Sequence, residues 1–273
     1  MRLSKVKRRF AKRIAVSRIA EQFWCEKKLE IKLMHGIEIK NDAMAVGEKV
    51  HREVALRDSL PEADNFLDWL GLQVYFSNVS LSQFYKNGIA REVFLVANIS
   101  QENWKWFLTG SVDELKLRDG KVQIVERKTR RSGGIPANLH HRIQAMLYHR
   151  MLGMLKRQDY SENLKAAYGL KEGVRISREF AEKAGIGNRE IMSISREIST
   201  KIMELPSLSD TIWLIYERQR GGETIGEVKF RVDEAWLEKI IDFARAYWTG
   251  EREALKTKDD WKCKYCELRR YCE

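Results

Sequence analysis

The stretch "GSVDELKLRDGKVQIVERK", residues 110 to 128, constrains the fold more than any other part of the sequence. Asp119-Gly120 separates two alternating runs, and this dipeptide is a strong signal for a two-residue β-hairpin, because both turn positions need positive φ. The turn fixes which residues face each other. Counting outward pairs Arg118 with Lys121, Leu117 with Val122, Leu115 with Ile124, and Asp113 with Glu126.

This register brings two carboxylates together on one face of the ribbon. Successive strand residues alternate between faces, so Asp113, Glu126 and Lys128 share a face that we expect to be buried. The apolar residues of that face are Leu115, Leu117, Val122 and Ile124. The other face carries Glu114, Lys116, Arg118, Lys121 and Gln123.

The opposed carboxylates Asp113 and Glu126 need a compensating charge or proton. Like charges directly across a strand pair have Cβ atoms about 4.5–5.5 Å apart and destabilise the sheet. Either a shared proton or a bound cation would offset the repulsion. We favour Mg²⁺ or Mn²⁺, hard ions that bind carboxylate oxygens, with Lys128 adding a nearby positive charge. The alternative is a slipped register or a surface hairpin with scattered charges.

The four cysteines form a second pattern. Cys25 stands alone near the start, and the other three end the chain in a C-x2-C-x5-C run, Cys263, Cys266 and Cys272. Such short spacings let thiolates converge on one metal centre, whereas disulfides are rare inside cells. Either Zn²⁺ or an iron-sulfur cluster suits four thiolates, and either would join the two ends of the chain. Four ordinary buried thiols are the alternative.

Composition favours an anionic partner. The 273 residues include 50 Lys+Arg and 39 Asp+Glu, which leaves a formal charge of +11. Nucleic acid is the commonest partner of such a chain. No stretch approaches the roughly 20 apolar residues that span a bilayer. The basic N-terminus lacks the apolar core of a secretory signal. We therefore expect an intracellular, cytoplasmic protein with no membrane partner.

Periodicity predicts the remaining elements. We expect helices over 4–34 and 41–60, a helix followed by a strand within 66–85, and a strand over 89–99. Residues 137–158 form an amphipathic helix, on which Gln144 and Tyr148 share a face with His141. The stretch 160–207 has helical character. A second hairpin surrounds Gly221-Gly222, and Asp233 can cap a final helix.

Four motifs in order resemble the PD-(D/E)xK nuclease superfamily, in its RecB-type branch. They are Gly47-x-x-x-His51, Gly110-x-x-Asp113, Glu126-x-Lys128 and Gln144-x-x-x-Tyr148. The split cysteine set resembles the iron-sulfur nucleases of that branch, which include the CRISPR-associated Cas-four family and exonuclease V. The middle residue of Glu-x-Lys is usually apolar in such proteins and is Arg127 here, where the register places it near Glu114.

The resemblance implies a fold and a set of cofactors. The fold is a restriction-endonuclease-like α/β fold, a mixed sheet flanked by helices. Residues 1–273 form one nuclease domain, with a RecB-type core over 20–155 and 210–272 and a helical insert over 160–207. A [4Fe-4S] cluster on the four cysteines closes the two ends. His51, Asp113 and Glu126 bind Mg²⁺ or Mn²⁺, and Lys128 completes the catalytic set.

The resemblance also implies an activity, metal-dependent hydrolysis of DNA. Gln144 and Tyr148 position the strand or Lys128, and Arg130, Arg131 and Arg142 follow the phosphate backbone. We expect an exonuclease that prefers single-stranded DNA ends, in CRISPR adaptation or DNA repair, with proteins of those systems as further partners. The alternative is a non-cleaving DNA-binding subunit of a larger complex.

Overall fold

The computed structural model describes residues 12–37, 39, 60–100, 106–131, 133–136, 138–187, 189–219 and 221–272. The strands are β1 (Arg13–Ala15), β2 (Ile89–Asn98), β3 (Phe107–Arg118), β4 (Lys121–Arg130), β5 (Thr211–Arg218) and β6 (Thr224–Arg231). The helices are α2 (Val16–Trp24), α3 (Glu26–His35), α5 (Phe66–Asn87), α6 (Leu139–Leu155), α7 (Tyr160–Tyr168), α8 (Arg178–Ala184), α9 (Ile191–Glu204), α10 (Glu234–Trp248) and α11 (Asp260–Lys264), followed by a 3-10 turn at Arg269–Tyr271.

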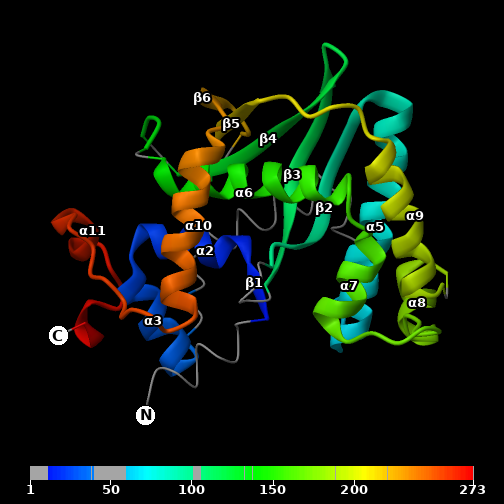
Figure 1. Ribbon diagram of the computed structural model, residues 1–273, viewed down its shortest axis with the longest axis horizontal. Coiled ribbons are helices and arrows are strands. Elements are labelled where there is room, and N and C mark those ends of the chain that lie inside the picture. The colour runs from blue at the N-terminus through cyan, green and yellow to red at the C-terminus, as the bar shows by residue number, and fades with distance from the viewer. Residues whose placement is uncertain are drawn as a thin grey trace.

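The six strands form one mixed sheet in the order β1-β3-β4-β5-β6, with β2 paired to β3. β1 runs parallel to β3 and β4 runs parallel to β5, while the other pairs are antiparallel. Helix α6 crosses the sheet, with α2 and α10 beside it (Figure 1). At the opposite end, α5 packs against β2 and α9. The predicted mixed α/β architecture is confirmed.

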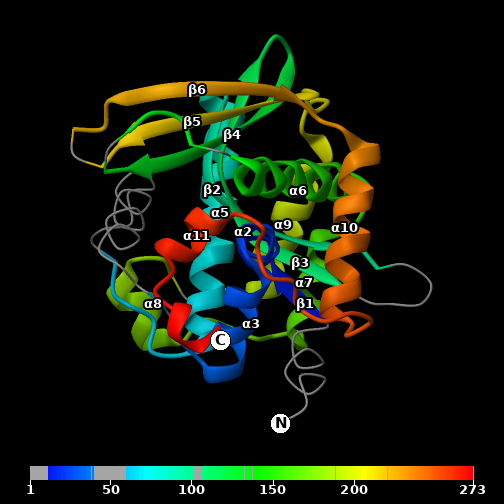
Figure 2. The ribbon, with the colours of Figure 1, turned by 90° about the vertical axis from the view of Figure 1, so that its left-hand side faces the viewer.

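The stretch 160–207 is helical, as predicted, and contains α7, α8 and α9. Helix α9 packs against α5, and α7 packs against β2 and α9. They lie on the other side of the molecule from α11 and the C-terminus (Figures 1 and 2).

Two element predictions are wrong. Instead of one helix over 4–34, the described part begins with β1 and then has two helices separated at Cys25, whose backbone is extended with φ −167°. Ile14 pairs with Leu108, and such long-range pairing is invisible to local periodicity. Residues 66–85 form no strand, because α5 continues to Asn87. The predicted helix over 41–60 lies outside the described residues, apart from Leu60.

Three local predictions are confirmed. Residues 89–99 form β2 and residues 137–158 contain α6. Asp233 caps α10 by accepting a hydrogen bond from the backbone N–H of Trp236 at 2.9 Å. Over the described ranges, the structure has no helix that is both long enough and apolar enough to cross a membrane.

Candidate active site

The hairpin has the predicted register. Asp119 and Gly120 both have positive φ, 50° and 70°. The ladder pairs Arg118 with Lys121, Leu117 with Val122, Lys116 with Gln123, Leu115 with Ile124 and Glu114 with Val125. The ladder ends one pair short of Asp113 and Glu126, whose charges both act on Lys128.

The burial of the hairpin differs from the prediction in two ways. Leu117, predicted to be buried, is 43% exposed because it lies near the turn, beyond the core. The second face carries polar residues as predicted, but two of them, Glu114 and Gln123, are buried rather than exposed. The sheet is covered on both sides at its centre, so a polar residue on either face needs partners.

Asp113 lies where two strands separate. β2 lines one edge of β3, and the other edge is shared by β1, at Phe107 to Thr109, and β4, from Glu114 onward. β4 then leaves β3 and pairs with β5 from Val125 to Arg130. Between the two partners, the segment that includes Gly110 and Asp113 pairs with neither β1 nor β4 within the described part of the chain. We call this place, where β4 separates from β3, the fork. It leaves space between the strands beside Asp113 and Glu126.

Charge is concentrated at the fork. Glu126 is fully buried and Asp113 is 8% exposed. Lys128 Nζ donates to Glu126 Oε1 at 2.6 Å. Burial lowers the pKa of Lys128, but the charges of Glu126 and Asp113 and the hydrogen bond to Glu126 outweigh it, so the pKa is raised. Lys128 is therefore protonated at neutral pH and places a positive charge beside the two carboxylates.

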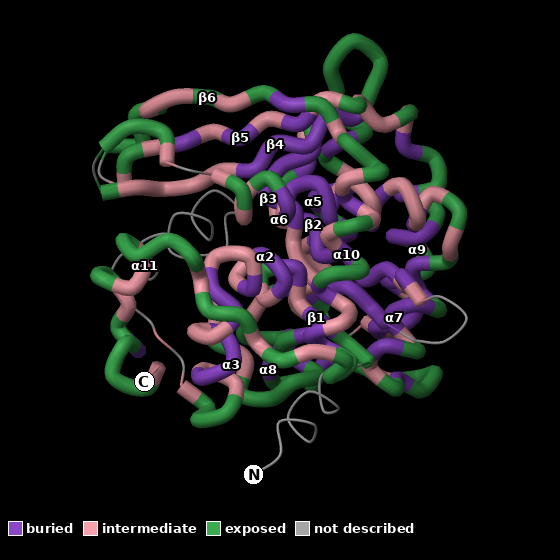
Figure 3. Tube along the Cα trace, turned by 60° about the vertical axis from the view of Figure 1, so that its left-hand side comes forward, coloured by how far each residue is buried: buried purple, intermediate pink, exposed green. Residues whose placement is uncertain are grey.

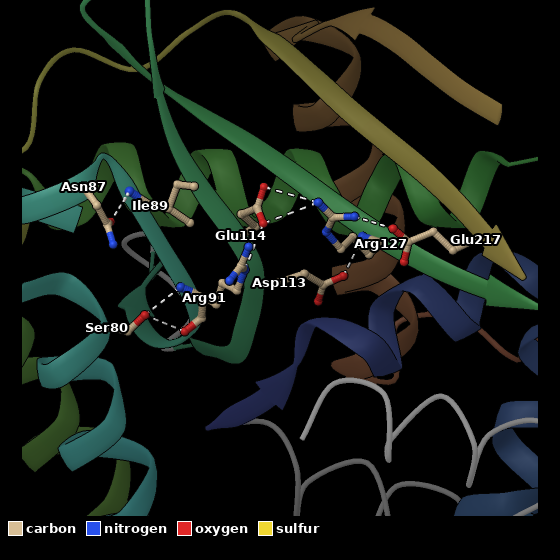
Figure 4. A network of polar contacts seen from close by, with 8 residues as sticks. All are labelled: Ser80, Asn87, Ile89, Arg91, Asp113, Glu114, Arg127 and Glu217. Atoms are coloured by element: carbon tan, nitrogen blue, oxygen red, sulfur yellow. Dashed lines mark hydrogen bonds and ion pairs between the residues drawn. The ribbon is translucent and has the colours of Figure 1, made fainter. Parts of the chain in front are cut away.

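Arg127 holds Asp113 through its backbone, while its side chain contacts two glutamates (Figure 4). Its backbone N–H donates to Asp113 Oδ2 at 2.7 Å. Its guanidinium pairs with Glu114 Oε2 at 3.4 Å and with Glu217. Arg91 Nε also pairs with Glu114, at 3.1 Å. The expected contact between Arg127 and Glu114 is confirmed, and it explains how a buried glutamate is tolerated on this face.

Helix α6 brings Tyr148 to the same fork. Tyr148 is buried, and burial together with the charges of Glu126 and Asp113 raises its pKa well above 10. Gln144 forms a side-chain hydrogen bond with Tyr148. A Cβ atom at Gly110 would lie 2.9 Å from Tyr148 Oη, closer than real contacts allow. Glycine at 110 therefore makes room for this neutral hydroxyl beside the carboxylates.

Tyr216 and His140, which the sequence analysis did not select, lie in these polar surroundings together with His141. Tyr216 on β5 is in register with Lys128, and its hydroxyl lies 3.0 Å from His141 Nδ1. Burial, with help from His140, Lys128 and Arg130, lowers the pKa of His141 to about 2. Burial, Lys128 and Lys262 lower the pKa of His140 to about 4. Both imidazoles are neutral at pH 7, so they serve as hydrogen-bonding groups rather than cations.

Of the three predicted backbone-tracking arginines, two lie at the end of β4 and the third lies on α6. Arg130 and Arg131 are at and just beyond the end of β4, and Arg130 donates to the carbonyl of Gly134 at 2.8 Å. Arg142 on α6 lies 4.7 Å from the ring centre of Phe230. His51, the predicted third metal ligand, and Gly47 lie outside the described residues. Sequence alternation could have indicated Tyr216, but its pairing with β4 is a long-range contact.

The four cysteines meet at one pocket of about 440 Å³. Cys25 comes from the break between α2 and α3, and Cys263, Cys266 and Cys272 come from the C-terminal segment. All four are free thiols. The two segments that carry the cysteines therefore line the same pocket. Within the described residues there is no group of three or more His, Cys, Asp and Glu side chains arranged to hold a single metal ion.

Comparison with known proteins gives one family. The family described as exonuclease V, a 5′ deoxyribonuclease, matches residues 2–122 and 188–273. These stretches include Asp113 and the four cysteines, while Glu126, Lys128, Gln144 and Tyr148 lie between them. Exonuclease V of Danio rerio is 25% identical over 297 residues, which cover 97% of this chain and 71% of the relative.

Two solved structures are also similar. The crystal structure of SSO0001 aligns with a TM-score of 0.44 and 14% identity, over 99% of this chain and 93% of that one. A provisionally named exonuclease from Eubacterium rectale aligns with a TM-score of 0.42 and 13% identity, over 97% and 90% of the two chains.

Proposed function

This chain belongs to the exonuclease V family, and from that premise we propose that it is a metal-dependent DNA exonuclease of the PD-(D/E)xK type. The observation that supports this most is the carboxylate pair, Asp113 and Glu126, at the fork between β3 and β4 with Lys128 beside it. The family description makes a 5′ end the expected point of attack. We expect single-stranded DNA to be the preferred substrate.

The chemistry of the donors suits Mg²⁺ or Mn²⁺. These ions bind carboxylate oxygens and retain several waters, so two carboxylates with one further ligand make an adequate site. Asp113 and Glu126 would supply the carboxylates, with His51 as the proposed third ligand. When bound, such an ion polarises a phosphoryl oxygen and lowers the pKa of a water molecule that it holds.

The remaining residues position the substrate. Lys128, charged at neutral pH, stabilises the negative charge that develops on the phosphoryl group. Tyr148 stays protonated, so its hydroxyl can donate a hydrogen bond to a phosphate oxygen, and Gln144 orients it. Arg130, Arg131 and Arg142 contact the phosphate backbone without reading sequence.

We propose that the four cysteines hold a [4Fe-4S] cluster. A single tetrahedral Zn²⁺ needs all sulfurs about 2.3 Å from one point, which requires a tight group. A four-iron cluster is larger and spreads its ligands, and a pocket of about 440 Å³ lined by all four thiols suits such a unit better. Reduced thiols also fit the expected intracellular setting.

Both biological settings predicted from the sequence, DNA repair and CRISPR adaptation, involve processing of DNA ends. Membership of the exonuclease V family favours the resemblance to exonuclease V over that to the CRISPR-associated proteins. The non-cleaving DNA-binding subunit is the alternative that experiment must separate from the nuclease.

Asp113→Ala separates them. A nuclease loses cleavage of end-labelled single-stranded DNA by a factor of about 100 or more but keeps its DNA affinity, because the carboxylate acts in catalysis rather than in binding. Asp119→Asn, at the exposed turn of the same hairpin, is the matched control and should cleave like the wild type. Absence of cleavage by the wild type with Mg²⁺ or Mn²⁺ would favour the binding subunit.

A further inference from the structure

The C-terminal segment, residues 255–272, combines exposed aromatic rings with exposed basic side chains. Trp261 is 50% exposed. Tyr265 is 78% exposed, the largest exposed fraction of any large hydrophobic residue in the described chain. Tyr271 is less available, since its ring lies 5.6 Å from that of His35. The exposed basic residues are Lys256, Lys258, Lys264, Arg269 and Arg270.

The segment carries an excess of positive charge. Residues 255–272 contain six Lys and Arg and three Asp and Glu, a net charge of +3 (6 − 3). Lysines and aromatics alternate most closely in "WKCKYC", residues 261 to 266. Most of this part of the chain is exposed (Figure 3). Rings that alternate with cations fit single-stranded nucleic acid, whose bases stack on aromatics while its phosphates pair with Lys and Arg.

The segment lies on the same side of the molecule as the start of α6, where His140 and His141 are found (Figures 1 and 2). The positive charges of Lys128 and Lys262 both help lower the pKa of His140, after burial, so His140 lies within electrostatic range of both lysines. Lys262 Nζ is 5.8 Å from the ring centre of Trp261. A DNA strand whose end reaches Lys128 therefore passes beside the C-terminal segment, residues 255–272.

We propose that Trp261 and Tyr265 stack on bases of single-stranded DNA outside the cleavage site, and that the lysines around them bind the adjoining phosphates. This surface deepens the proposed exonuclease function and rests on it. The same short segment, α11 and the residues after it, carries both three of the four thiols and the two rings. The DNA path then has two parts, the fork at Asp113 and this stacking surface.

The proposal predicts a loss of affinity that depends on bases. Loss of one stacking ring weakens binding by roughly 5- to 150-fold. Affinity is measured by fluorescence anisotropy with a labelled single-stranded oligonucleotide, in an Asp113→Ala background so that the probe stays intact. Tyr265→Ala should weaken binding by such a factor, whereas Tyr265→Phe, which keeps the ring, should bind like the parent.

An abasic oligonucleotide of equal length tests stacking directly. Because it has no bases to stack, Tyr265→Ala should not weaken its binding further, and the two changes should be non-additive. Tyr85→Ala is the matched control, since Tyr85 is 46% exposed but lies on α5. Iron content and visible absorbance of each variant show that the cysteine site is intact.

Two results would overturn the proposal. One is unchanged affinity of Tyr265→Ala for the intact oligonucleotide. The other is an equal loss for the intact and abasic strands, which would make the contact non-stacking. Neither result depends on cleavage, so failure of the stacking surface is distinct from failure of the nuclease, which is measured on the wild type with metal.

Discussion

At the scale of single residues, the missing Cβ atom of Gly110 leaves the space that Tyr148 occupies in the site. Gly110 has an ordinary backbone conformation, so glycine is not needed there for a positive φ. It is needed because a Cβ atom would take up space next to Tyr148. That space is filled by the hydroxyl of Tyr148, a protonated donor beside Asp113 and Glu126. The glycine of the Gly-x-x-Asp motif thus has a physical reason in this chain.

Gly110→Ala should therefore displace Tyr148. A shift of about 1 Å in a positioning group can lower kcat up to about 100-fold. Tyr148→Phe removes the hydroxyl and leaves Cε1, at 3.1 Å, as the nearest ring atom, so Gly110→Ala should cost less in that background. Gly153→Ala is the control, because its Cβ would meet only Leu208 at 3.7 Å. Equal penalties in both backgrounds, measured by single-turnover cleavage, would contradict the account.

The sequence was informative about single residues when one local turn determined them. Asp119-Gly120 fixes the register, and the register alone predicts that Asp113 faces Glu126. Tyr216 could not be predicted in the same way. Its place beside Lys128 depends on the parallel pairing of β4 with β5, two strands that are far apart in the chain.

At the scale of elements, the site exists because β4 changes partner. β4 pairs with β3 near the turn and with β5 at its other end. The start of α6 brings His141 to Tyr216 of β5 and His140 within reach of the charge of Lys128. The sequence predicted both hairpins but neither β1 nor the parallel pairings, because hairpins have local turn signals and parallel pairs do not. The helix over 66–85 was cut short in the prediction because its aromatic residues also favour strands.

The partly buried histidines His140 and His141 of α6 should make stability depend on pH. Their pKa values in the folded state, about 4 and about 2, lie below the ordinary value of 6.5, so the unfolded chain binds more protons between these limits. Stability should fall as pH drops from 6.5 towards 4, by at most about 1.4 kcal/mol per pH unit for each histidine.

Urea unfolding at several pH values measures this effect. His140→Asn should flatten the dependence between pH 6.5 and 4, since it removes one titrating group and leaves His141. His35→Asn, on α3, is a suitable control. An unchanged slope in His140→Asn would show that His140 is protonated equally in both states.

At the scale of the whole molecule, polar contacts join the chain ends next to the cysteine pocket. Glu26, beside Cys25, accepts hydrogen bonds from Arg252 Nη1 and Nη2 at 2.6 and 2.5 Å and from the backbone N–H of Leu255 at 2.8 Å. Gln22 donates to Glu26 at 2.7 Å and accepts from Trp248 Nε1 at 2.9 Å. This buried junction orients the two segments that carry the thiols.

Glu26→Ala should weaken both the fold and the cysteine site. Removal of one partner of a fully buried ion pair costs about 3–5 kcal/mol in the free energy of unfolding, and this pair, whose Arg252 side chain is partly exposed, should cost less. Iron content per chain should fall as well, because the segment from Arg252 onward loses its anchor. The control is Glu267→Ala, which breaks an exposed pair with Lys28 and should cost about 1 kcal/mol or less. Equal effects of the two variants would refute the role of the junction.

The central claim is that Asp113 and Glu126 together hold a divalent ion that DNA cleavage requires. The direct measurement is Mn²⁺ binding, followed by electron paramagnetic resonance, in parallel with digestion of 5′-end-labelled single-stranded DNA with and without chelator. The account predicts that the wild type cleaves only without chelator and that Glu126→Gln loses Mn²⁺ binding and cleavage together. Cleavage that persists in chelator, or normal Mn²⁺ binding and cleavage by Glu126→Gln, would contradict it.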